Sequence, residues 1–223
     1  CYGDDILGGY AEQVVSPSEG VYKVPDSMDY ISAAAFPVVY GTSHIGLKEK
    51  LDLKPGEILL VHGAAGGVGL TAVELGKKMG AIVIATAGGQ DKLAVAREYG
   101  ADHLIDYREE DIRARVKQIT DGRGADCIYD PVGGELFEKT KRCAAWDSRL
   151  VIIGFTAGSI PKMETNRVLL KNMSLIGLAW GQYMKRRPKM VERCQEKLYG
   201  LLREGLIDPL IFDTLPFSRA IEG

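Results

Sequence analysis

A glycine-rich corner between an apolar run and a helical pattern constrains the fold more than any other feature of the sequence. The segment Leu59–Gly89 reads LLVHGAAGGVGLTAVELGKKMGAIVIATAGG, and its first apolar run ends near His62. The helical pattern begins within a group of glycines, which are Gly63, Gly66, Gly67 and Gly69. A helix that starts directly after a strand points its first unpaired N–H groups, and the positive end of its dipole, beyond the edge of the sheet. Such a corner attracts a phosphate group, and the lack of side chains lets the phosphate approach.

The position of this corner in the chain favours a dinucleotide-binding site. It follows the first strand of the predicted sheet and opens a helix, as the dinucleotide fingerprint requires. The spacing is Ala64-Ala65-Gly66-Gly67-Val68-Gly69 rather than the plain GxGxxG. The alternative is a tight turn whose glycines serve only the backbone conformation and bind nothing.

From Glu57 onward, short apolar runs alternate with stretches of helical periodicity. The runs are nearly continuous in Val, Ile and Leu, which is typical of strands buried on both faces of a parallel sheet. They occupy Ile58–Val61, Ile82–Ala85, His103–Ile105, Cys127–Asp130, Leu150–Ile153 and Met173–Leu178. Between the first two, apolar residues share one helical face, namely Val68, Ala72, Leu75 and Met79. The alternation predicts an α/β fold, a Rossmann doubly wound sheet of six parallel strands.

The flanks of this α/β region follow other patterns. Residues 10–15 (YAEQVV) and 21–24 (VYKV) lie between Gly and Pro turn signals and are typical of short strands. Residues 27–50 predict two helices that are broken near Pro37. After Pro188, residues 190–205 predict one further helix, with Gly205 as its stop.

The second strand of the predicted sheet ends in Thr86-Ala87-Gly88-Gly89, without an acidic residue. In folds that select NAD, an Asp or Glu at this place binds the ribose 2′-hydroxyl, and a carboxylate there would repel a 2′-phosphate. Lys92 follows on the next helix, and Tyr107 and Arg108 follow the third strand, whose end should lie beside that of the second. A cation and a phenol at one place suit a phosphate dianion, so the sequence favours NADPH over NADH. The alternatives are an exposed helix lysine at Lys92 and a packing role for Tyr107.

Composition argues against several classes of protein. The net charge is −2 and no broad basic field is present, so we expect no nucleic acid partner. No stretch of about 18 apolar residues predicts a membrane span, and no signal peptide is evident. The four cysteines are scattered without CxxC spacing, so we expect neither a disulfide framework nor a zinc cluster. The expected compartment is reducing: the cytoplasm, with the mitochondrion as the alternative.

Several stretches closely resemble one family. They are HGAAGGVG (62–69), ATAGGQDKLAVAREYGADHLIDYREED (85–111), GADCIYDPVGGELFEKT (124–140) and RLVIIGFTAG (149–158). They resemble the zinc-independent quinone oxidoreductases of the medium-chain dehydrogenase/reductase superfamily, and the likeness covers essentially the whole chain. The resemblance implies a GroES-like catalytic domain before the Rossmann domain, with NADPH in the cleft between them. We therefore expect a piece of a longer polypeptide: a remnant of the GroES-like domain at 1–27 and an NADP-binding domain at 28–223, with interdomain helices at 28–50.

The resemblance also implies which residues bind the cofactor. Ten positions match the family's contacts, and they are Thr42, Gly66, Gly67, Val68, Gly88, Lys92, Tyr107, Gly133, Phe155 and Thr156. Residues 66–68 would hold the pyrophosphate. Gly88, Lys92 and Tyr107 would hold the adenosine 2′-phosphate.

The other four positions would lie along the rest of the cofactor. Gly133 would contact it through the backbone, Phe155 and Thr156 would flank the nicotinamide, and Thr42 would approach the nicotinamide from the interdomain helix. The alternatives are an ordinary turn glycine at Gly133, a core phenylalanine at Phe155, and a surface or back-bonded threonine at Thr42.

The resemblance disfavours a metal. The zinc-containing branch of the superfamily carries a cysteine-rich lobe just before the segment GGYAE, and here CYGDDIL with only Cys1 occupies that stretch. His44, His62 and His103 have no cysteine partners nearby in the sequence, so a catalytic zinc cannot be built from them. We expect no metal site.

The activity that the resemblance implies is hydride transfer from NADPH to quinones or related conjugated carbonyls. The alternatives are an enoyl or alkenal double-bond reductase, and a non-catalytic NADPH-binding or interaction protein. Tyr40, Tyr183 and Asp130 are possible proton donors on position alone, so the catalytic residues stay unassigned. Residues 173–181 (MSLIGLAWG) predict a last strand whose edge could pair in a homodimer, and a loop over that edge is the alternative.

Overall fold

The computed structural model describes residues 10–16, 18 and 21–222. By its internal contacts the chain separates into two compact units, and each is described by itself. The helical unit comprises Cys1–Gly41 and Ala179–Gly223, and the sheet unit comprises Thr42–Leu178. The predicted domain boundary at residue 27 rests on family resemblance and stays a prediction.

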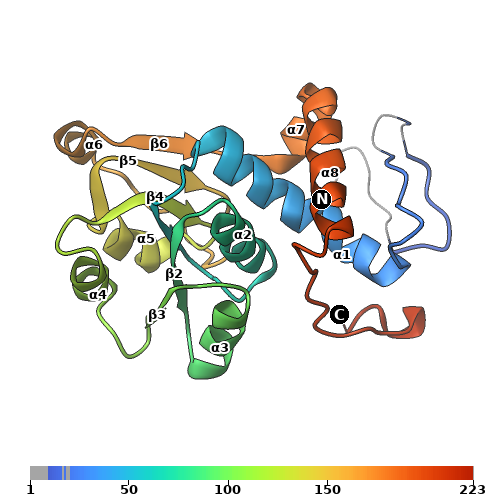
Figure 1. Cartoon of the computed structure of the whole chain (residues 1–223), viewed down its shortest axis with the longest axis horizontal. Coiled ribbons are helices and arrows are strands. Elements are labelled where there is room, and N and C mark those ends of the chain that lie inside the picture. The colour runs from blue at the N-terminus through green and yellow to red at the C-terminus, as the bar shows by residue number, and fades with distance from the viewer. Residues whose placement is uncertain (1–9, 17, 19–20, 223) are drawn as a thin grey trace. The chain divides into compact units, whose positions relative to one another are not determined.

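The sheet unit contains one sheet of six strands that all run parallel (Figure 1). The strands are β1 (Ile58–Val61), β2 (Ile82–Ala87), β3 (His103–Asp106), β4 (Ala125–Asp130), β5 (Ala144–Ile152) and β6 (Ser174–Gly177). Their order is β3-β2-β1-β4-β5-β6, so the chain winds to one side from β1 and then to the other from β4. This order confirms the predicted Rossmann doubly wound sheet.

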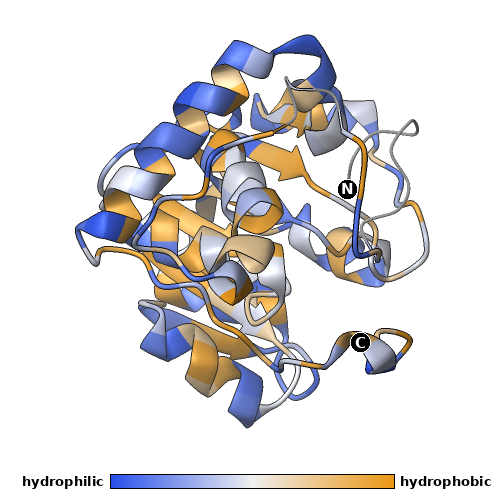
Figure 2. Ribbon diagram, turned by 90° about the vertical axis from the view of Figure 1, so that its right-hand side faces the viewer, coloured by the Kyte–Doolittle hydropathy of each residue, from blue (hydrophilic) through white to orange (hydrophobic). Residues whose placement is uncertain are grey.

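Helices pack on both faces of this sheet (Figure 2), which explains why its central strands β1 and β2 are almost entirely apolar and buried. On one face, α4 (Ile112–Ile119) and α5 (Gly134–Thr140) contribute to a core cluster with Leu60 and Ile128. On the other face, α2 (Gly67–Lys78) approaches β1 so closely that a Cβ on Gly76 would lie 2.5 Å from the Leu59 side chain. The remaining helices of the unit are α3 (Gln90–Glu98) and α6 (Thr165–Lys171).

Helix α1 (Tyr30–His44) shows that the expected break at Pro37 was wrong, because the helix continues through the proline. Proline removes one backbone N–H and normally ends or kinks a helix. Here stacked aromatic rings span the position: the Phe36 ring centroid lies 4.6 Å from that of Tyr40 and 5.6 Å from that of Tyr199. Phe36 and Tyr40 are buried, and their burial offsets the lost hydrogen bond.

The remaining elements include the helix that was predicted after Pro188. They are a π-helical turn at Ile45–Lys50, α7 (Trp180–Arg186), α8 (Pro188–Arg203) and a 3₁₀ turn at Phe217–Arg219. Helix α8 is the helix predicted after Pro188, and Gly205 follows its end with a φ of 65°.

Residues 10–15 and 21–24 form no strand, so the expectation of two short strands there was wrong. A strand needs a neighbour for its hydrogen bonds, and no described segment pairs with either stretch.

Candidate dinucleotide-binding site

A cavity of about 290 Å³ lies at the carboxyl ends of the strands in the sheet unit. In doubly wound sheets, ligands bind at this edge, where the strand order reverses. The cavity is lined by Gly63, Ala65, Gly66, Gly67, Val68, Gly69, Ala87, Gly88, Lys92, Tyr107, Pro131, Val132 and Thr156. Among these residues only Lys92 carries a charge, so the lining favours an anion over a cation.

The glycine corner forms one wall of the cavity, and its tight geometry explains why side chains are absent. Gly63 has a φ of 57°, a region that glycine adopts without strain. A Cβ on Gly69 would lie 2.1 Å from the Gly63 carbonyl oxygen, so that position has no room for a side chain. Helix α2 begins at Gly67, with Gly66 as its N-cap. The first N–H groups of α2 have no acceptor within the helix, and they belong to this wall of the cavity.

His62 supports the corner from below and is fully buried. Its Nδ1 lies 2.8 Å from the Thr86 hydroxyl oxygen, and its Nε2 lies 2.7 Å from the Thr140 hydroxyl oxygen. Burial lowers the pKa of His62, and the charge of nearby Asp130 opposes this effect. A neutral imidazole, with both ring nitrogens engaged by hydroxyls, therefore links β1, β2 and α5 beneath the cavity. This link has no signature in the sequence, since its three members lie far apart along the chain.

The opposite wall is formed by the ends of β2 and β3. A Cβ on Gly88 would lie 2.8 Å from the Tyr107 hydroxyl oxygen, so the phenol lies directly over this bare backbone. Tyr107 is partly exposed, and Lys92 lies on the first turns of α3. The structure thus brings Gly88, Lys92 and Tyr107 to one wall of one cavity.

The loop after β5 closes a third side. The backbone N–H of Thr156 and its hydroxyl both donate to the Pro131 carbonyl oxygen, each over 3.2 Å. Phe155 lies beside the cavity rather than in its lining, where a Cβ on Gly133 would come within 2.9 Å of its ring. Gly133 is in turn held by its N–H, which donates to the Asp130 carboxylate over 3.0 Å.

Thr42 lies outside the cavity lining and is 4% exposed. Its neighbour Ser43 is the centre of a buried hydroxyl network. The Ser43 hydroxyl donates to the Val68 carbonyl oxygen over 2.8 Å and lies 2.8 Å from the Thr71 hydroxyl and 3.0 Å from the Tyr129 hydroxyl. The network ties the end of α1 to the start of α2 and so fixes the backbone of the glycine corner.

Seven of the ten predicted cofactor positions line the cavity, and Thr42, Gly133 and Phe155 do not. Whether any of the ten contacts a cofactor stays a prediction. The structure adds Pro131 and Val132 to the lining. Their signal in the sequence was their place directly after an apolar strand, where the ends of parallel strands meet.

The three positions named as possible proton donors have different surroundings. Tyr40 is 1% exposed and stacks on Phe36. Asp130 is 1% exposed, and one carboxylate oxygen accepts N–H groups from Val132 and Gly133. Tyr183 lies on α7 in the helical unit. Catalytic residues therefore stay unassigned.

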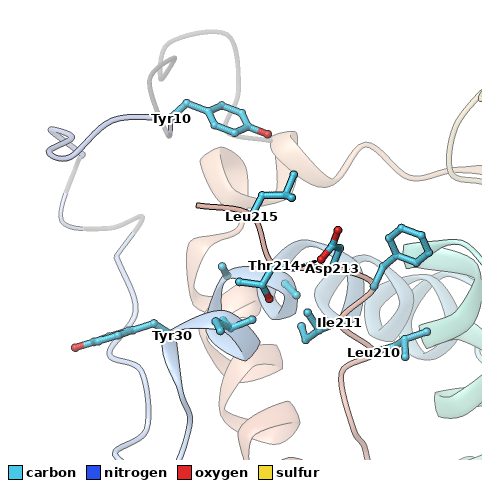
Figure 3. Close-up of a pocket in the computed structure, with 11 residues that line it drawn as sticks. Tyr10, Tyr30, Leu210, Ile211, Asp213, Thr214 and Leu215 are labelled. Carbon is cyan, nitrogen blue, oxygen red and sulfur yellow. Dashed lines mark hydrogen bonds between the residues drawn. The ribbon is translucent and has the colours of Figure 1, made fainter. Parts of the chain in front are cut away.

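The helical unit has a cavity of its own, of about 690 Å³ (Figure 3). It is lined by Tyr10, Tyr30, Ile31, Ala34, Ala35 and the segment Leu210–Leu215. Asp213 is the one charged residue in this lining. Such a surface suits apolar groups and not a phosphate.

The described residues include no group of three or more His, Cys, Asp or Glu side chains that could hold a metal ion. Cys127, Cys143 and Cys194 are buried. Burial raises the pKa of Cys127 and of Cys143 to about 12. Across residues 10–16, 18 and 21–222, no helix has the length and apolar character that crossing a bilayer requires.

Comparison with known proteins agrees with this geometry. The sequence profile of the family described as zinc-binding dehydrogenase matches residues 67–196, more than half of the chain. A curated protein from Nematostella vectensis, quinone oxidoreductase-like protein 2 homolog, is 38% identical over 209 residues, which are 91% of this chain and 57% of that protein. The chain thus spans somewhat more than half the length of this relative.

Solved structures show the same fold. A mycobacterial protein complexed with NADPH superposes with a TM-score of 0.91 at 27% identity, over 97% of this chain and 67% of the other. The CurK enoyl reductase superposes with a TM-score of 0.81 at 26% identity, over 92% of this chain and 60% of the other. The chain belongs to the zinc-binding dehydrogenase family and is a quinone oxidoreductase-like member of the medium-chain dehydrogenase/reductase superfamily.

Proposed function

We propose that the chain is the coenzyme-binding part of an NADPH-dependent oxidoreductase that reduces quinones or related conjugated carbonyls. One observation carries the proposal: the corner at residues 63–69 presents bare backbone to a cavity whose one charged lining residue is Lys92. The names of the relatives and the NADPH complex of the mycobacterial neighbour support it.

The residues present fit a dinucleotide with a 2′-phosphate. The N–H groups at the start of α2 would bind the diphosphate, because the glycines that line the cavity there carry no side chain that would exclude it. Lys92 and Tyr107 would both donate charge-assisted hydrogen bonds to the 2′-phosphate. The loop at Thr156, held against Pro131, would position the nicotinamide end.

Bound NADPH supplies the hydride for an electron-poor acceptor. The contribution of this chain is to bind the cofactor, orient it and keep water from its diphosphate.

The second candidate is reduction of an activated carbon–carbon double bond, which the likeness to the CurK enoyl reductase favours. Both reactions deliver hydride to a conjugated system and would use the same coenzyme site. A non-catalytic NADPH-binding protein is the third candidate. A homodimer formed through the exposed edge of β6 also stays a prediction.

Steady-state oxidation of NADPH by the full-length protein distinguishes these candidates. We expect turnover with a para-quinone and slower turnover with an enone. A strong preference for the enone would replace the proposed substrate class with the second candidate. NADPH binding without oxidation by either acceptor would support the non-catalytic candidate.

Binding of the cofactor is tested separately with paired lysine variants. We expect Lys92→Gln to weaken NADPH binding about tenfold, which corresponds to about 1.4 kcal/mol. Lys78→Gln, the same change at an exposed position on α2, is the matched control and should bind as the wild type does. If the unchanged protein bound neither NADPH nor NADH, the proposed site would be wrong.

A further inference from the structure

Two turns meet on the wall of the cavity that holds Gly88. One is Gly88–Gly89 after β2, and the other is Tyr107–Arg108 after β3. A Cβ on Gly88 would lie 2.7 Å from Arg108 Nε, and a Cβ on Gly89 would lie 3.8 Å from Arg108 Nη1. The guanidinium of Arg108 therefore lies over the bare backbone of both glycines, next to the Tyr107 hydroxyl.

A single buried carboxylate holds both turns in place. Asp106 is 4% exposed, and its two oxygens accept the N–H groups of Gly89 and Arg108, each over 3.1 Å. The N–H of Tyr107 donates to the Ala87 carbonyl oxygen over 3.2 Å and adds a direct link between the turns. The backbone that carries Arg108 is thus fixed relative to the cavity wall.

The charge of Arg108 is uncommitted. Within the part of the chain that the structure describes, its side chain forms no ion pair and no hydrogen bond. The neighbouring acid Glu110 lies 2.7 Å from Arg115 Nε and also accepts the Asp106 N–H, so it is engaged elsewhere. A cation that lies on a fixed backbone and whose side chain has no partner among the described residues is available to an anionic ligand.

The surrounding acids make a second cation necessary for binding a dianion. The Asp106 carboxylate lies directly beneath the two turns, and Asp91 lies in the first turn of α3 beside Lys92. With these two acids, Lys92 alone would leave this wall with a net charge of −1. A guanidinium adds a charge and a planar set of donors that matches two phosphate oxygens at once.

We propose that Arg108 is a specificity-determining residue, the second cation of the 2′-phosphate subsite, and that Asp106 positions it. This inference rests on the proposed function, because it assigns the selectivity of the same NADPH site. It implies that discrimination between NADPH and NADH depends on Arg108 together with Lys92 and not on Lys92 alone.

The test compares dissociation constants for NADPH and NADH, measured by nicotinamide fluorescence on the full-length protein. We expect Arg108→Gln to weaken NADPH binding at least tenfold and NADH binding less than twofold. Arg108→Lys keeps the charge without the planar donors and should recover part of the loss. Arg113→Gln, the same substitution at an exposed position on α4, should leave both constants unchanged.

The outcomes separate this inference from the proposed function. If the wild type prefers NADPH and Arg108→Gln keeps the same NADPH-to-NADH ratio, Arg108 has no part in selectivity and the inference is overturned. Equal weakening for both cofactors would also overturn it, because it would indicate a structural role. If the wild type does not bind NADPH, the proposed function itself fails. Should Arg108→Gln not fold, the ratio measured for Arg108→Lys decides, since an unchanged ratio there contradicts the role of the planar donors.

Discussion

At several residues of the cavity, the absence of a side chain or of a charge is what the structure requires. Gly69 has no side chain because the Gly63 carbonyl oxygen occupies its place, and Gly88 has none because Tyr107 and Arg108 lie over it. His62 contributes no charge, because burial holds its imidazole neutral between two hydroxyls. The sequence could predict the glycines from their cluster after a strand. It could not predict the His62 contacts, which depend on tertiary packing.

Gly69→Ala tests the steric argument. The new Cβ would lie 2.1 Å from a backbone oxygen that cannot rotate away, so the corner must shift. We expect a loss of roughly 1–3 kcal/mol in the free energy of unfolding, as for other overpacked sites. Gly200→Ala on α8, where nothing lies within 4 Å of the added Cβ, is the control and should be neutral or slightly stabilising. Urea titration measures both, and equal stabilities would contradict the argument.

The buried imidazole of His62 makes stability depend on pH. Its pKa in the folded state lies below the ordinary value of 6.5, so the unfolded chain binds the proton more readily. Stability is therefore complete above about pH 6.5 and falls as the pH drops below it, by up to about 1.4 kcal/mol per pH unit. Unfolding free energies at pH 7.5 and 5.5 should show this loss, and it should shrink in His62→Asn. An equal loss in the variant would assign the effect to other groups.

At the scale of elements, an ion cluster fastens the loop after β5 to helix α5. The Lys141 ammonium lies 2.8 Å from a Glu164 carboxylate oxygen and 2.5 Å from Glu138, and the Lys141 side chain is 2% exposed. Glu164 precedes α6 and closes the loop that begins with Phe155 and Thr156. The cluster thus holds the far end of the segment that lines the third side of the cavity.

Lys141→Met should loosen this loop. The substitution keeps an apolar stem and leaves two largely exposed carboxylates, so we expect a modest loss of about 1 kcal/mol in stability. Hydrogen exchange should accelerate at the N–H groups of Thr156 and Ala157, which donate to Pro131 and Val132. Lys139→Met, at an exposed position on the same helix, should change neither quantity. Unchanged exchange in Lys141→Met would show that the loop is held by its backbone contacts alone.

The elements also show where sequence patterns succeed. Strands such as β1 and β4 were predictable, because a short continuous apolar run between turn signals is typical of a strand that is buried on both faces of a parallel sheet. Helix α1 was not, since the local cost of Pro37 is outweighed by stacking between Phe36 and Tyr199, which lie far apart in the sequence. Residues 10–15 lie between turn signals as a strand does, yet a strand exists only where a neighbour accepts its hydrogen bonds.

At the scale of the whole molecule, cofactor binding should appear as stability. A ligand that binds only the folded chain stabilises it by about 2.7 kcal/mol at a concentration 100 times its dissociation constant. We expect NADPH to raise the melting temperature more than NADH at equal concentration. Scanning calorimetry with each cofactor measures this, and Lys92→Gln should reduce the difference. Equal shifts for both cofactors would contradict the predicted selectivity.

The burial of Cys127, Cys143 and Cys194 has a consequence for a protein that we propose to reduce electrophiles. Quinones and enones alkylate sulfur through the thiolate, and a thiol whose pKa lies near 12 is almost entirely protonated at neutral pH. Burial therefore protects Cys127 and Cys143 from arylation by the molecules that we propose as substrates, so the proposed reaction would not inactivate the protein at these two thiols.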